Sequence, residues 1–173
     1  MFLAFVLPVI AISYVGGTMF HATRSHEIWL LLDWVPIMLL CLAAVVFFIF
    51  KIRKIWWQRL LFFIAIFALQ LGVRLLPVPV KMRISIGYVI TAVTILTPII
   101  WYLRMTNMRN FWLVLLAFGS FGLAVTFRVL DSHVKLLSMG THWLWHLFGG
   151  ISVFFLIRYI LVDGQYRFRS HLH

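Results

Sequence analysis

The stretch IWLLLDWVPIMLLCLAAVVFFIF, residues Ile28–Phe50, contains one charged side chain, Asp33. A helix needs roughly 20 mostly apolar residues to cross the hydrocarbon core of a bilayer, so this stretch is long enough to span a membrane. An aspartate at the centre of a spanning helix costs roughly 2.5–3.5 kcal/mol on insertion scales, and such a residue usually faces the bundle interior or a wet cavity. The stretch therefore predicts a transmembrane helix and marks Asp33 as a candidate functional residue.

The composition of the whole chain indicates the same environment. Of its 173 residues, 64% are hydrophobic and 11% are charged, whereas a soluble domain carries roughly 25% charged residues. We therefore expect an all-α protein, a polytopic transmembrane helical bundle of about six spans, forming a single domain over residues 1–173. The predicted spans are Phe2–Phe20, Ile28–Phe50, Ile55–Val73, Ile84–Leu103, Phe111–Phe127 and Leu137–Leu161.

The formal net charge of +11 does not indicate a nucleic-acid partner. The basic residues are scattered singly between apolar runs, where they act as topology signals and contact lipid headgroups. With six spans, nine basic residues fall on the side of the termini and six on the other side. The positive-inside rule then predicts that both termini face the cytoplasm.

Ionisable side chains gather on the side opposite the termini. His21 lies at the end of the first predicted span, Asp33 near the start of the second, and His142 and His146 near the start of the sixth. His142 and His146 are four residues apart and share one helix face, a common way to offer two imidazoles to a metal. Together with His21 they match a catalytic zinc site, which has three protein ligands and one open position. We therefore expect zinc near the extracytoplasmic face.

Asp33 has two possible roles beside such a metal. It can act as general base toward water, whose pKa zinc lowers to about 7, or it can orient one of the histidines. Two alternatives to zinc stay open for the histidines. A histidine in a membrane helix is often an interfacial or interhelical hydrogen-bonding residue, and a pair four residues apart can instead ligate haem groups.

Two segments carry a resemblance to a known family. The segment GTMFHATRSHEIWLLLDWVPI, Gly17–Ile37, resembles the second and third membrane helices of alkaline ceramidases, and THWLWHLFGG, Thr141–Gly150, is similar to their last helix. The wider superfamily includes the progestin and adipoQ receptors and the Per1-type lipid-remodelling enzymes. The resemblance implies a ceramidase-like bundle that lacks the first of seven helices.

The resemblance also implies a function. It implies that His21, His142 and His146 bind zinc, that Asp33 handles the water, and that a ceramide-like lipid is cleaved at its amide into a fatty acid and a sphingoid base. The family pattern places a serine four residues before the first histidine, where this chain has Gly17. The nearby hydroxyls of Ser13 and Thr18 are therefore added to Asp33 as candidate catalytic groups.

Three other functions remain open within the superfamily. One is a hydrolase of an ester-linked lipid, although the chain lacks the cysteine-bearing N-terminal region that is usual in Per1-type enzymes. Another is a non-catalytic metal-binding receptor or scaffold of the adipoQ type. The third is a member that folds without activity, because a glycine stands in place of the serine.

Overall fold

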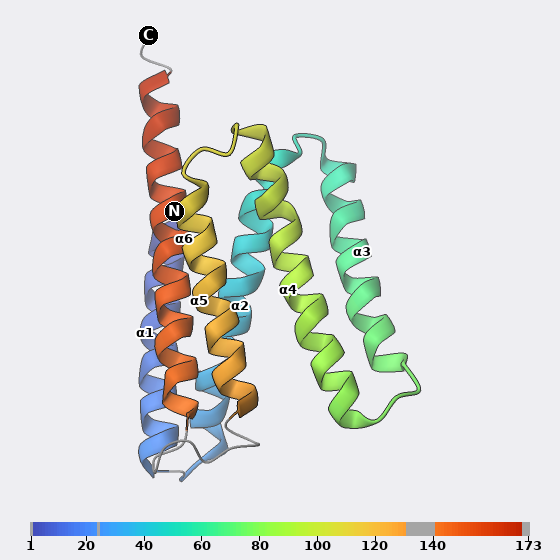
Figure 1. Cartoon of the computed structure of the whole chain (residues 1–173), viewed down its shortest axis with the longest axis vertical. Coiled ribbons are helices and arrows are strands. Elements are labelled where there is room, and N and C mark those ends of the chain that lie inside the picture. The colour runs from blue at the N-terminus through green and yellow to red at the C-terminus, as the bar shows by residue number, and fades with distance from the viewer. Residues whose placement is uncertain (1, 24, 131–140, 171–173) are drawn as a thin grey trace. The chain divides into compact units, whose positions relative to one another are not determined.

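The computed structural model describes residues 2–23, 25–130 and 141–170, and these residues contain helices and no strands (Figure 1). The prediction of an all-helical protein with six helices is confirmed. The first four residues of the predicted span Leu137–Leu161 lie outside the described residues. The helices are α1 (Phe2–Thr23), α2 (Glu27–Ile52), α3 (Trp56–Leu75), α4 (Val80–Met105), α5 (Phe111–Leu130) and α6 (His142–Ser170).

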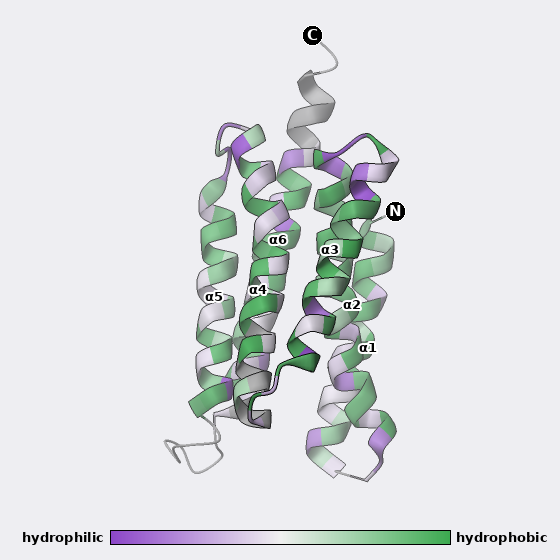
Figure 2. Ribbon diagram, turned by 90° about the vertical axis from the view of Figure 1, so that its right-hand side faces the viewer, coloured by the Kyte–Doolittle hydropathy of each residue, from purple (hydrophilic) through white to green (hydrophobic). Residues whose placement is uncertain are grey.

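The helices have the length and composition of membrane spans. Five of them qualify over their described residues: α1, α2, α3, α5 and the segment Trp143–Gly164 of α6. In α4 the described apolar segment is shorter, Val89–Met105. Figure 2 shows apolar residues along the helices and many of the polar residues at helix ends and turns. The chain is therefore an integral membrane protein.

The chain divides into two compact units, Met1–Asn107 with α1 to α4 and Met108–His173 with α5 and α6. The single domain expected over residues 1–173 stays a prediction. In the first unit α2 packs against α1 and α4, and α3 packs against α4. Fully buried rings of Phe48 and Tyr102 join α2 to α4, with their centroids 5.5 Å apart. The side-chain amide of Gln70 donates to the Thr91 hydroxyl at 3.3 Å and links α3 to α4.

Prolines set the boundary between α3 and α4, as the sequence predicted. The helix α3 ends at Leu75, and α4 begins at Val80 directly after Pro79. Proline lacks the backbone N–H that a helix interior requires but is well tolerated at a helix start. The predicted start at Ile84 was therefore four residues late.

In the second unit α5 packs along α6. The rings of Phe127 and Phe148 stack with their centroids 5.5 Å apart. The Thr141 hydroxyl, directly before α6, donates to the carbonyl of Phe127 at 2.9 Å. These contacts fix the start of α6, which carries two of the predicted metal ligands, against the last turn of α5.

Candidate metal centre

His21 and Asp33 meet where α1 is followed by α2. Because α1 ends at Thr23 and α2 begins at Glu27, the last turn of α1 lies beside the first turns of α2. His21 Nε2 lies 3.8 Å from Asp33 Oδ2, and the side chains are 37% and 11% exposed, respectively. The structure thus brings together two of the predicted site residues, and the Asp33 carboxylate is largely buried.

Two consecutive glycines of α1 allow this approach. Gly16 and Gly17 are both buried against α2. A Cβ at Gly16 would collide with the Leu32 side chain and lie 2.7 Å from the Leu32 carbonyl oxygen. A Cβ at Gly17 would lie 2.7 Å from Asp33 Oδ1 and 3.5 Å from its Cγ. The carboxylate therefore occupies the space that any larger residue at position 17 would need.

The helix α2 contains a proline close to the residues that face Gly16 and Gly17. Pro36 lies inside α2 and has no N–H, so it cannot donate the helical hydrogen bond to the carbonyl of Leu32. This carbonyl is the one that faces Gly16. The Ser13 hydroxyl of α1 donates to the carbonyl of Asp33 at 3.2 Å. Small residues and interhelical hydrogen bonds of this kind are the usual means by which membrane helices associate.

The hydroxyls proposed from the sequence lie elsewhere than on the carboxylate. The Ser13 hydroxyl contacts the backbone of Asp33, and Thr18 is exposed. From the sequence, Gly17 was considered only as the position at which the ceramidase pattern has a serine. Its role beside Asp33 was missed, although two adjacent glycines in a membrane helix are a signal of close helix packing.

His142 and His146 lie one helical turn apart on α6, in the second unit. His142 is the first residue of this helix, and its side chain lies outside the described part of the chain. His146 is half-buried, and its ring lies edge-on to that of Trp145, with the centroids 6.5 Å apart. That His142 and His146 share one face of α6 follows from their four-residue spacing and stays a prediction.

The residue types suit a transition metal. His21 and His146 each offer an imidazole nitrogen, and Asp33 offers a carboxylate oxygen. Zinc binds these donors at about 2.0–2.2 Å, and imidazole is its most common nitrogen ligand. The donor chemistry therefore fits the zinc that the sequence predicts, while the identity of the metal stays a prediction.

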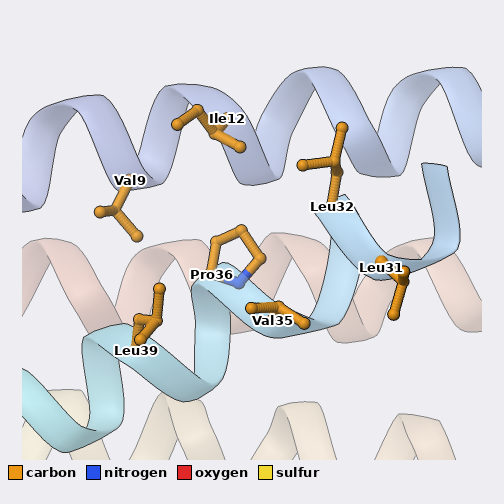
Figure 3. A pocket seen from close by; sticks show the side chains of 7 residues that line it. All are labelled: Val9, Ile12, Leu31, Leu32, Val35, Pro36 and Leu39. Carbon is orange, nitrogen blue, oxygen red and sulfur yellow. The ribbon is translucent and has the colours of Figure 1, made fainter. Parts of the chain in front are cut away.

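An apolar groove of about 360 Å³ lies between α1 and α2. Figure 3 shows its side chains, which come from both helices. The groove includes Leu32, the direct neighbour of Asp33, and extends along α2 to Leu39. Its lining consists of Val9, Ile12, Leu31, Leu32, Val35, Pro36 and Leu39. A hydrocarbon chain is the kind of ligand that such a surface accepts.

Comparison of the chain with protein-family models, with curated proteins and with solved structures finds no match. The resemblance to alkaline ceramidases therefore rests on the residue pattern alone.

Proposed function

We propose that this chain is a zinc-dependent intramembrane amide hydrolase that acts on ceramide-like lipids. The observation that carries the proposal is the pair formed by His21 and the buried Asp33, 3.8 Å apart, between otherwise apolar helices. A carboxylate in a membrane helix is expensive and generally marks a functional site. The pattern that resembles the ceramidases assigns a metal ligand and a proton acceptor to these same two residues.

In this proposal His21, His142 and His146 hold the zinc ion. Three imidazoles leave one coordination position for water or substrate, as in known catalytic zinc sites. When bound, zinc acidifies water and polarises the carbonyl of the amide. Asp33 accepts the proton of the attacking water and returns it to the leaving nitrogen as the C–N bond breaks. The products are a fatty acid and a sphingoid base.

The apolar groove supports a lipid substrate. An alkyl chain lying along Ile12 and Leu39 would bring the polar amide of the lipid to the level of Asp33. The excess of basic residues on the side of the termini supports a centre near the extracytoplasmic face and termini in the cytoplasm.

A second candidate is a non-catalytic metal-binding protein of the same superfamily. The observation in its favour is Gly17, which stands at the position of the family serine and where a Cβ would lie 2.7 Å from Asp33 Oδ1, so that any side chain there requires the carboxylate to move. Ser13 does not replace the missing group at the carboxylate, because its hydroxyl donates to the backbone. Such a protein would bind zinc without hydrolysing lipid.

Metal analysis and a ceramide hydrolysis assay on the detergent-purified protein test both candidates. We expect one zinc ion per chain and fatty-acid release, both lost in His142→Ala and His146→Ala. The matched control is His26→Ala, because His26 is exposed at the N-cap of α2 and makes no side-chain capping bond. Unchanged hydrolysis in both α6 variants would overturn the hydrolase proposal, and zinc without turnover would favour the second candidate. Release from phospholipids in place of ceramides would identify an ester hydrolase, and a Soret band would identify haem.

A further inference from the structure

Basic residues, which the sequence predicts to be scattered singly, form one cluster around the turn between α2 and α3, at the end of α2 that is remote from Asp33. This basic turn consists of Lys51, Arg53, Lys54 and Arg59. The sequence from residue 34 to residue 130 contains no aspartate or glutamate. The positive charge of the turn therefore has no carboxylate within this stretch to neutralise it.

Two guanidinium groups of the basic turn are held in place by aromatic rings. The Arg53 guanidinium lies over the ring of Trp101 on α4, with Cζ 4.4 Å from the ring centroid. The Arg59 guanidinium lies over Phe50 at 4.2 Å, and its Nε donates to the carbonyl of Arg53 at 2.7 Å. Stacking uses the face of a guanidinium and leaves N–H groups at its edge for an acceptor. Among the described residues, the buried Nε of Arg53 has no hydrogen-bond acceptor.

The start of α3 adds partial positive charge to the same turn. The N-cap residue Ile55 makes no side-chain capping bond, so its own side chain does not satisfy the first N–H groups of α3. Helix N-termini of this kind bind phosphate groups readily. Trp56 and Trp57 follow directly and are 71% and 48% exposed. Exposed tryptophans at a helix end are typical of the headgroup level of a bilayer.

We propose that the basic turn binds the headgroup of an anionic phospholipid. The phosphodiester accepts hydrogen bonds from Arg53, Arg59 and the start of α3, and the exposed Lys54 adds attraction at longer range. The flanking tryptophans favour a lipid over a free anion, because they hold the turn at the depth where lipid phosphates lie. This site is separate from the metal centre and does not depend on the proposed hydrolase.

Lipid retention by the purified full-length chain tests the proposal. The protein is reconstituted in phosphatidylcholine nanodiscs with a minor fraction of phosphatidylglycerol, and the lipids that stay bound after release into detergent are counted by native mass spectrometry. We expect retention of phosphatidylglycerol over phosphatidylcholine. Removing one cation from the turn should weaken this binding about fivefold. The Arg53→Gln, Arg59→Gln double variant should therefore weaken it roughly 25-fold.

Two further variants separate a specific site from general charge and from misfolding. Lys54→Gln leaves the stacked rings intact and should weaken retention about fivefold. Arg74→Gln removes an exposed charge at the other end of α3 and should leave retention unchanged. Equal retention by the wild type, Lys54→Gln and the double variant would overturn the proposal. So would equal losses in Lys54→Gln and Arg74→Gln, or full displacement of the lipid by millimolar inorganic phosphate.

Discussion

The close approach of Gly17 to Asp33 allows the metal-centre proposal to be tested by a substitution at a residue that is not a proposed metal ligand. In Gly17→Ala the new Cβ would lie 2.7 Å from Asp33 Oδ1, whereas ordinary van der Waals contact begins at 3.4 Å. The two atoms must therefore separate by about 0.7 Å. A functional group generally has to be held within about 0.5 Å of its working position. The substitution should therefore displace the carboxylate from His21 without removing any proposed ligand.

We expect Gly17→Ala to weaken zinc binding roughly 10- to 100-fold, the usual loss when a group that orients a metal ligand is disturbed. The affinity is measured by competition with a fluorescent chelator on the purified protein. Gly72→Ala is the matched control, because a Cβ at Gly72 meets nothing within 4 Å. Wild-type zinc affinity and wild-type hydrolysis in a folded Gly17→Ala protein would refute the reasoning. Gly17→Ser would then show whether the family serine can be restored at this position.

Three further substitutions test the surroundings of Asp33. Gly16→Ala places a Cβ against the backbone of Leu32, which cannot swing away. The substitution should destabilise the fold by about 1–3 kcal/mol, measured as a lower thermal midpoint in detergent. A midpoint equal to that of the wild type would contradict the close packing of α1 and α2. Ser13→Ala removes one hydrogen bond to the Asp33 carbonyl and should lower the free energy of unfolding by about 0.5–1.5 kcal/mol while hydrolysis continues. Complete loss of turnover in a folded variant would instead indicate that this hydroxyl is catalytic. Ile12→Trp fills the apolar groove and should raise KM for long-chain ceramides more than for short-chain ones; an equal effect on both would exclude the groove as the acyl site.

The helices could be predicted from the sequence because transfer of apolar residues into a bilayer depends mainly on length and composition. All six helices are present, and the boundaries of the first five differ from the predicted ones by at most four residues. The predicted start of the sixth span lies outside the described residues, and α6 ends at Ser170, nine residues after the predicted end at Leu161. The sequence also predicted that His21 and Asp33 lie at one face of the membrane, and the structure places their side chains 3.8 Å apart. No such argument predicted the rotation of each helix about its axis. Hydropathy therefore could not show that Gly17 lies against Asp33 or that Ser13 faces the backbone of α2.

The distance between the basic turn and Asp33 has a consequence for the thickness of the host membrane. Lys51 and Asp33 are 18 residues apart on α2, or about 27 Å along the helix axis. The hydrocarbon core of a typical bilayer is about 30 Å thick, so a helix held at the headgroup level by its basic end places Asp33 just inside the opposite boundary. A thinner bilayer would move the carboxylate out among the headgroups, and a thicker one would draw it away from water or tilt the helix. Hydrophobic mismatch would then regulate access of water to Asp33.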